Sequence, residues 1–504
     1  MAKQSINIGS SANDGTGSTL RAAFDICNDN FTELYGGTTS ALAFKAEGTN
    51  FTGSLIIGHS TTGTISSATY NTALGIGAMD AITQGDYNVA IGYNAATALT
   101  TATHNTIVGA TAGDALTTGI QNVAVGYQAL GAEDTGQGAV AVGYQALASQ
   151  NADGSFHNVA VGFQCGTNIS TGGQNTLIGD SAGYNLTTGG NNIAIGFKAL
   201  YTEDGNGNNI AIGREALEVQ NAGADAYNVA IGYRAGHAVT TGIRNTIIGG
   251  LAGDAMTTGV DSVAVGHNAL GALTIGNNNV AIGKDALGTS VDGDYNVAVG
   301  YEALKTYEDG DGNGFNTAIG AKAMKHATTA EYNASLGYNA LGNATMTGDS
   351  NVAVGYAAGM ETTDGDSNTL IGRNAGASIT GGDRNVAIGR NALDAEDTGS
   401  RSVAVGYNAL SAQNYGTNNY NVAVGYNAGV SVVGGIQNTL IGSLAGDALT
   451  DGVENVVVGY AALSSEDGHG KNTAIGAYAL NALNAGADAY NVALGYQAGY
   501  LVST

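Results

Sequence analysis

The stretch Asn122-Val123-Ala124-Val125-Gly126 is one copy of a five-residue motif that recurs through most of the chain. Close variants begin at 25 positions from Asn71 to Asn491. Successive copies are usually 17 residues apart, as from Asn105 to Asn122, and a few steps are longer. The first position is Asn in 22 copies, the fifth is Gly in all 25, and the eighth is Ala in 24. A fixed period of this kind indicates a solenoid, in which each repeat packs on its neighbours. The departures at the first position are Ala139, Ser262 and Ser402.

Each repeat contains one short predicted strand, Val-Ala-Val or a close variant, flanked by turn residues. Alternation places the second and fourth positions of the motif on one face and the third, usually Ala, on the other. Both faces are apolar, which predicts burial on both sides and a close neighbour against the Ala row. We therefore expect an all-β parallel β-solenoid of about 25 coils with a 17-residue period, spanning residues 54–504.

The first and fifth positions are the predicted structural residues of each coil. Asn88 and Asn122 precede their strands, where an Asn side chain bonds nearby backbone groups or stacks in a ladder on its equivalents. Gly92 and Gly126 follow, where the backbone needs a positive φ or a close approach. Tyr often comes next, which predicts an exposed aromatic row. The extra residues of longer coils precede the next Asn and predict loops on one side.

A second rhythm is superimposed on the first. The ninth position alternates between two Leu coils and two Gly coils, which makes the larger unit four coils, the step from Asn105 to Asn175. Its first members are Leu130, Leu147, Gly166 and Gly183.

Residues 1–38 lie outside the repeat, and residues 39–53 form a polar transition. A helix is predicted from about residue 20 to 35, with Leu20, Phe24 and Phe31 on a heptad seam that also includes Cys27 and Leu34. Such a seam favours packing against copies of the same helix. The alternative is that the helix lies on its own chain.

Composition excludes several classes of function. The formal charge is −25, from 41 acidic and 16 basic residues among 504, which disfavours nucleic acid as a partner. The start of the chain has no apolar signal region, and no run of about 18 apolar residues occurs, so we expect synthesis in the cytoplasm and no membrane span. Two cysteines are too few for a disulfide framework, and Cys165, where the other coils have Ala, is predicted to be a buried core residue.

No catalytic or cofactor-binding residues are predicted. Asp309, Asp311 and Asn313 resemble the first half of a calcium loop, but Gly320 stands where the closing Glu belongs. We interpret this segment as a solvated turn and predict no metal site. A polysaccharide-cleaving solenoid would need grouped carboxylates that interrupt the repeat, and no coil is unusual in this way. The sequence therefore predicts a protein that is not an enzyme.

Two parts of the chain, the N-terminal segment and the repeats, resemble known protein families. The segment INIGSSANDGTGSTLRAAFDICNDNFTELY, residues 6–35, resembles the N-terminal segment of many tailed-phage fibre and baseplate-associated proteins. The repeats, such as SVAVGYNAL from Ser402 and NVAIGYRAG from Asn228, are similar to the head repeats of trimeric autotransporter adhesins. This second resemblance implies a left-handed, trimeric β-roll, although the coils of that family are shorter.

Together these observations predict a structural fibre protein of a phage virion, a homotrimer that contacts other baseplate or fibre proteins through residues 1–38 and supports attachment to the host surface. The alternative is an adhesin-like module that binds a host surface glycan through exposed loops and Tyr rows.

Overall fold

The computed structural model describes residues 44–46, 52–57, 66–308 and 313–503. The fold is an all-β parallel β-solenoid of about 25 turns, with no helix among the described residues. The chain divides into two compact units, unit 1 up to Gly207 and unit 2 from Asn208. The predicted helix at 20–35, with Leu20, Phe24 and Phe31, lies outside the described residues.

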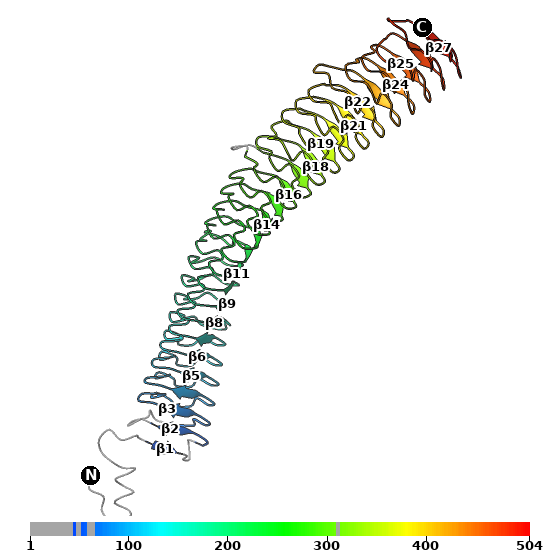
Figure 1. The fold of residues 1–504 in the computed structure, drawn as a ribbon. Helices are drawn as coiled ribbons and strands as arrows, with labels where there is room; N and C mark the ends of the chain where they lie inside the picture. Colours follow the sequence, from blue (N-terminus) through cyan, green and yellow to red (C-terminus); the bar gives the residue numbers. More distant parts are fainter. Residues whose placement is uncertain (1–43, 47–51, 58–65, 309–312, 504) are drawn as a thin grey trace, which may run out of the picture. The chain divides into compact units, whose positions relative to one another are not determined.

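Unit 1 contains ten three-residue strands, stacked in one row (Figure 1). They are β1 (Phe44–Ala46), β2 (Leu55–Ile57), β3 (Thr72–Leu74), β4 (Val89–Ile91), β5 (Thr106–Val108), β6 (Val123–Val125), β7 (Val140–Val142), β8 (Val159–Val161), β9 (Thr176–Ile178) and β10 (Ile193–Ile195). β1 pairs antiparallel with β2, and from β2 onward each strand pairs parallel with the next.

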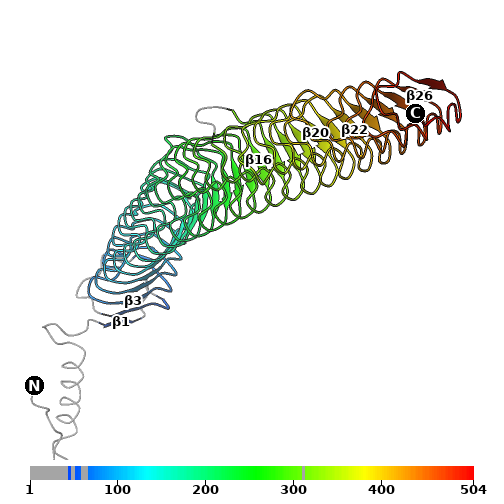
Figure 2. The ribbon, with the colours of Figure 1, turned by 45° about the horizontal axis from the view of Figure 1, so that its top comes forward.

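Unit 2 repeats the arrangement with seventeen strands (Figure 2). They are β11 (Ile210–Ile212), β12 (Val229–Ile231), β13 (Thr246–Ile248), β14 (Val263–Val265), β15 (Val280–Ile282), β16 (Val297–Val299), β17 (Thr317–Ile319), β18 (Ala334–Leu336), β19 (Val352–Val354), β20 (Thr369–Ile371), β21 (Val386–Ile388), β22 (Val403–Val405), β23 (Val422–Val424), β24 (Thr439–Ile441), β25 (Val456–Val458), β26 (Thr473–Ile475) and β27 (Val492–Leu494).

The pairing keeps every coil in the same register, so that equivalent residues lie directly above one another. Val123, Ala124 and Val125 pair with Val140, Ala141 and Val142, and Val263 pairs with Val280 in unit 2. Residues at the same position of successive repeats therefore form a row along each unit, and one sequence period corresponds to one coil.

The two strand faces differ in a way that corrects the sequence-based expectation. The middle residue of each strand from β2 to β27 points into the coil and is buried, as at Ala124 and Ala264. The first and third strand residues point outward and stay half-exposed, as at Val123 and Val125. The prediction of burial on both sides is therefore wrong for the single chain. The row that faces outward is the Val and Ile row, and the Ala row forms the core.

The glycine at the fifth position is required by both conformation and space, as predicted. Gly92 and Gly126 have φ values of 140° and 137°. At Gly266, where φ is 133°, a Cβ atom would come within 2.7 Å of the carbonyl carbon of Gly283 in the next coil. Any side chain here would meet backbone that cannot move aside, because the strands fix the distance between coils.

The alternation of Leu and Gly at the ninth position has a packing explanation. Leu177 occupies the middle strand position in β9, where most coils have Ala, and it is fully buried. A Cβ atom at Gly166 or Gly183 would come within 2.8 and 2.9 Å of the Leu177 side chain. The two glycines therefore leave the volume that Leu177 fills, which conserves the total volume of the core. In unit 2, Gly359 and Gly376 flank Leu370 in the same way.

Candidate functional site

The asparagine at the start of each strand forms the predicted ladder and also closes its own coil. The backbone N–H of Asn105 donates to Oδ1 of Asn88 at 3.0 Å, which links successive coils. The Nδ2 of Asn88 donates to the carbonyl oxygen of Ala102, 14 residues later in the same coil, at 2.8 Å. Asn122 makes the equivalent bonds to Asn105 and Gly136. These side chains are fully buried, so each bond replaces one that water would otherwise provide.

One gap in the ladder of unit 1 is filled by a buried carboxylate and a buried amide. Ala139 offers no side-chain oxygen to the next coil, and Nδ2 of Asn158 donates instead to Oε1 of Gln150 at 2.9 Å. Nε2 of Gln150 donates to Oε2 of Glu133 at 3.0 Å, and Oε1 of Glu133 accepts the backbone N–H of Gly136 at 2.6 Å. All three side chains are buried, and the chain of bonds fixes the orientation of both amides.

The same arrangement recurs in unit 2 at Ser402. Nδ2 of Asn421 donates to Oε1 of Gln413 at 2.8 Å, and Nε2 of Gln413 donates to Oε2 of Glu396 at 2.6 Å. Oε1 of Glu396 accepts the N–H of Gly399 at 2.8 Å, and Nδ2 of Asn419 donates to Oε2 at 2.8 Å. Glu396 therefore holds the long loop of the next coil, residues 414–420, against the coil below.

Four fully buried glutamates share this position: Glu133, Glu203, Glu396 and Glu466. In each, one carboxylate oxygen accepts the backbone N–H of the residue three positions later. Neither oxygen is accessible to a substrate, so these groups are structural. The sequence interpretation missed them because Glu-Asp followed by Gly or Thr reads as a surface turn. The available signal was their spacing, since each pair, Glu133 with Glu203 and Glu396 with Glu466, is separated by one four-coil unit.

Burial changes the acidity of two of these groups. Desolvation raises the pKa of Glu133 and of Glu396 above the ordinary value of 4.5, although hydrogen bonds from the neighbouring Gln and from backbone N–H groups oppose the shift. Glu302, a further buried residue in unit 2, behaves in the opposite way. Hydrogen bonds from Lys325 and Lys305, both at 2.9 Å, lower its pKa to about 2.

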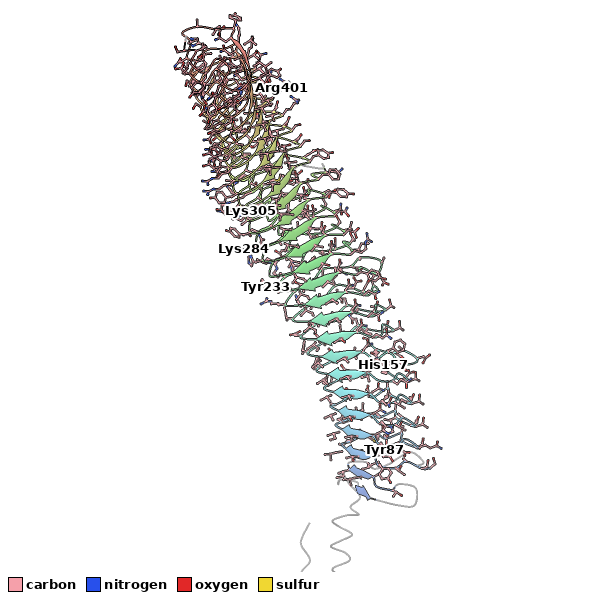
Figure 3. All side chains as sticks on the ribbon, turned by 90° about the vertical axis from the view of Figure 1, so that its right-hand side faces the viewer. Tyr87, His157, Tyr233, Lys284, Lys305 and Arg401 are labelled. Atoms are coloured by element: carbon pink, nitrogen blue, oxygen red, sulfur yellow. The ribbon has the colours of Figure 1, made fainter. Side chains whose placement is uncertain are left out.

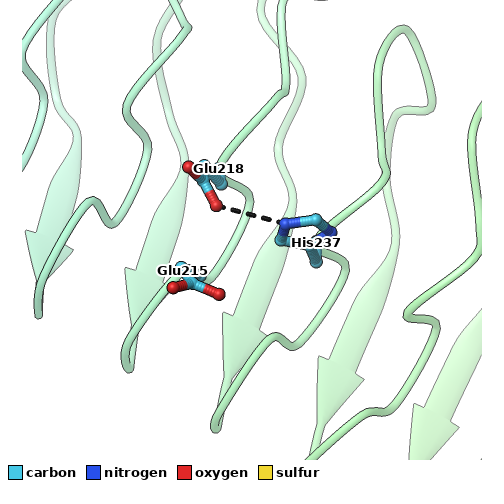
Figure 4. Close-up of side chains that lie close together, drawn as sticks. All are labelled: Glu215, Glu218 and His237. Atoms are coloured by element: carbon cyan, nitrogen blue, oxygen red, sulfur yellow. Dashed lines mark hydrogen bonds and ion pairs between the residues drawn. The ribbon is translucent and has the colours of Figure 1, made fainter.

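One cluster in unit 2 has the residue types of a metal site. Glu215, Glu218 and His237 bring ligand atoms within 4.8 Å of one another (Figure 4). Nη2 of Arg234, however, lies 3.1 Å from Nδ1 of His237. A guanidinium only donates, so Nδ1 accepts, and Nε2 carries the proton donated to Oε2 of Glu218 at 3.1 Å. Both ring nitrogens are engaged, and the cluster is an ion-pair network that connects two coils.

The remaining candidate metal ligands are not arranged as an open set of ligand atoms in the described part of the chain. Asp309 and Asp311 lie outside the described residues, and Asn313 is an exposed residue in a β-bridge with Asp294. Glu466, Asp467 and His469 also lie close together, but Oε1 of Glu466 already accepts the backbone N–H of His469 at 3.0 Å. Cys165 is fully buried at its Ala position, as predicted, and burial raises its pKa to about 12.

Two aromatic rows flank the strands, where one was predicted. One follows the fifth-position glycine, as in Tyr127, Tyr144 and Phe163, with ring centroids 5.3 and 5.1 Å apart. The other precedes the asparagine and includes Tyr87 and His157, on the same flank of unit 1 in Figure 3. The rings stack face to face along the row, with interplanar angles of 20° and 12° in the first run. Within such a run each ring covers one face of its neighbour, and these inner faces are closed to a sugar.

The outward face of β3–β10 is almost free of charge. It comprises the two outward strand rows and the two flanking rows, and Asp180 is its only Asp, Glu, Lys or Arg among the described residues of these coils. Many of its apolar side chains are well exposed, including Tyr87 at 52%, Ile91 at 37% and Tyr93 at 57%. A nearly uncharged face with several well-exposed apolar side chains is a candidate interaction site.

The buried carboxylate predicts a specific dependence of stability on pH. The native state of a carboxyl with a raised pKa retains its proton at higher pH than the unfolded chain does. The stability from Glu396 is therefore fully present below pH 4.5 and decreases as the pH rises through the raised pKa. We expect the melting temperature of the wild type, relative to Glu396→Gln, to fall as the pH rises from about 4.5 to about 7. The control Glu454→Gln, at an exposed residue, should follow the wild type. Parallel curves for all three proteins would contradict this role of Glu396.

Comparison with known proteins gives no further constraint on identity. Within the described residues, no helix is long and apolar enough to cross a membrane. No family model matches the sequence, and no curated protein matches it either.

Proposed function

We propose that this chain is a structural fibre protein of a phage virion, with the solenoid as a shaft that supports attachment to the host surface. The observation that carries the proposal is the regular coil itself, whose ionisable clusters are used to hold coils and loops together. Each of the four fully buried glutamates accepts hydrogen bonds from internal donors, and Arg234 contacts His237 in the cluster with Glu215 and Glu218. We infer a structural role without catalysis, because no free constellation for chemistry remains among these groups.

Residues 1–38 supply the proposed point of attachment to the virion. The solenoid presents nearly equivalent coils, so that a partner would meet many similar registers along it. The N-terminal segment lacks the repeat, and residues 6–35 resemble the N-terminal segment of tailed-phage fibre proteins. We infer that this segment contacts baseplate or fibre proteins and that the chain, made in the cytoplasm, functions in the virion.

We also infer a homotrimer whose copies pack through unit 1. The outward face of β3–β10 is apolar and nearly uncharged, which suits burial against copies of itself in a chain whose net charge of −25 otherwise keeps copies apart. The predicted heptad seam at 20–35 would reinforce the contact. The similarity of the repeats to trimeric adhesin heads supports three copies and a left-handed coil.

Glycan binding through the Tyr rows is the weaker candidate. Stacked neighbours such as Tyr338 and Tyr356, with centroids 5.4 Å apart, cover one face of each ring and so reduce the surface on which sugars would stack. The rows are better explained as a reinforcement between coils, since each stacked pair adds about 0.5–1.5 kcal/mol beyond burial.

Deletion of residues 1–38 tests the proposed function. Virions from a phage lacking the gene should incorporate the full chain supplied in trans and exclude the truncated chain, because the docking segment is missing. The matched control deletes residues 368–437, one four-coil block, so that Ser367 joins Asn438 in register. This control should enter virions. Full incorporation of the truncated chain, or absence of the wild type from virions, would overturn the docking role.

Charge placed on the outward face of unit 1 should weaken the trimer. We expect sedimentation equilibrium of the wild type to give about three times the 50.0 kDa of one chain. The double substitution Ile91→Asp and Tyr93→Asp buries charge in the proposed interface and should weaken association at least tenfold, or about 1.4 kcal/mol. Thr101→Asp with Thr118→Asp adds the same charge at exposed turns and should leave it unchanged. A monomeric wild type, or equal behaviour of the two variants, would refute the interface.

A further inference from the structure

Half of the eight arginines in this chain lie within three successive coils of unit 2. Arg373 and Arg390 follow β20 and β21, and Arg384 and Arg401 precede β21 and β22; all four are exposed. We call them the arginine patch. Residues that follow the strands, such as Tyr233 and Lys284, lie on one flank of the strand row, and Arg401 lies on the other (Figure 3). The patch therefore places one pair of arginines on each flank of the outward face.

Three of the four guanidinium groups are held by aromatic rings. Arg373 lies 5.6 Å from the ring centroid of Tyr356, Arg390 lies 5.8 Å from that of Tyr407, and Arg401 lies 5.7 Å from that of Tyr420. A guanidinium that lies over a ring can still direct N–H groups to a carboxylate or a phosphate, although Nη1 of Arg401 also donates to the hydroxyl of Tyr420 at 3.4 Å. The stacking thus orients the donors before any ligand arrives, which lowers the entropic cost of binding.

The patch has little internal charge compensation. Among the described residues, its one ion pair is between Arg384 and Asp383, at 3.8 Å. Arg373 and Arg390 occupy equivalent positions in adjacent coils, and so do Arg384 and Arg401, so each pair is separated along the stack by about one strand spacing of 4.8 Å. Like charges at this separation repel. Acidic residues are abundant in this chain, whose net charge is −25, yet only Asp383 forms an ion pair with one of the four arginines among the described residues.

A second copy packed in register would not neutralise the patch. The outward positions of these coils contain no carboxylate: Ser367, Thr369, Ile371, Val386, Ile388, Val403, Val405 and Tyr407. Equivalent coils meet in a parallel assembly, and arginine would then face arginine. An anion that pairs with the whole patch would therefore come from another molecule.

We propose that the arginine patch binds an acidic polysaccharide, whose carboxylate or phosphate groups pair with the arginines while its sugar rings contact the apolar residues between them. Exposed Ile371 and Ile388 lie in the outward strand rows between the two flanks. Arginine pairs bidentately with both carboxylate and phosphate, so the anionic group can be of either kind. A nucleic acid fits less well, because its dense phosphates would be repelled by the acidic remainder of the chain. The proposed fibre function enters this inference at one point: it identifies the host surface as the source of the polysaccharide.

The test measures binding of the full chain to immobilised polygalacturonate, a phosphate-bearing teichoic acid, neutral dextran and double-stranded DNA at about 50 mM salt. We expect one or both acidic polysaccharides to bind in preference to dextran and DNA. Arg390→Gln with Arg401→Gln should weaken that binding at least tenfold. The control Arg214→Gln with Arg244→Gln removes the same charge from arginines paired with Glu215 and Asp261, and should change binding less than twofold.

Three outcomes would overturn the proposal: no binding of either acidic polymer beyond dextran, equal loss in the two variants, or DNA binding that is tighter and equally sensitive to the patch. Equal melting temperatures of the variants and the wild type exclude misfolding as the cause of a loss. Incorporation of the patch variant into virions is measured separately. A variant that enters virions but loses polysaccharide binding supports the patch, whereas exclusion of the wild type from virions counts against the fibre function and not against the patch.

Discussion

The structure depends on one side chain, the buried asparagine that precedes most of the strands. Its Nδ2 closes its own coil on a carbonyl 14 residues later, as from Asn368 to Gly382 at 2.7 Å, and its Oδ1 accepts the N–H of the next asparagine, Asn385, at 2.9 Å. One amide thus sets both the circumference of a coil and its register on its neighbour. Where the ladder lacks an asparagine, at Ala139 and Ser402, Nδ2 of the next asparagine donates to a buried Gln that is bonded to a buried Glu, and at Ser262 the hydroxyl accepts the N–H of Asn279. A requirement for buried polar groups to be satisfied therefore explains both the rule and its exceptions.

The same constraint separates interior from surface and so shapes the proposed functions. Asparagine and the middle strand residue point inward, and the alternation of a strand then directs the Val and Ile rows outward. Selection can change these outward rows without disturbing the coil. In unit 1 these rows and the rows that flank them are almost uncharged, which suits contact with copies, and in unit 2 the flanking rows carry the arginine patch, which suits an external anion. Both proposed functions therefore use outward-facing rows of residues that take no part in the asparagine ladder.

The repeat predicted most of the fold, because period and turn residues are local signals. The roles of Asn88, Asn122, Gly92 and Gly126 follow from the motif and are confirmed. The motif did not reveal which strand face is inside, since Val and Ala are both apolar and alternation alone does not orient them. That choice is made by Asn, whose buried bonds point to the same side as Ala. The buried Glu133 and Glu396 were missed because their partners Gln150 and Gln413 lie one coil away, a proximity visible only after the coils are stacked.

The ladder is tested most directly by changing one asparagine of unit 2 to aspartate and following hydrogen exchange. Asn438→Asp replaces a donor to the carbonyl of Gly452 with a buried carboxylate, which should cost about 2–5 kcal/mol locally. Asn414→Asp adds the same charge at an exposed residue two coils away. We expect backbone amides of the coils next to Asn438 to exchange markedly faster in the first variant and to retain wild-type protection in the second. Equal protection in both variants would contradict the account, because the coils would then be held together without the ladder.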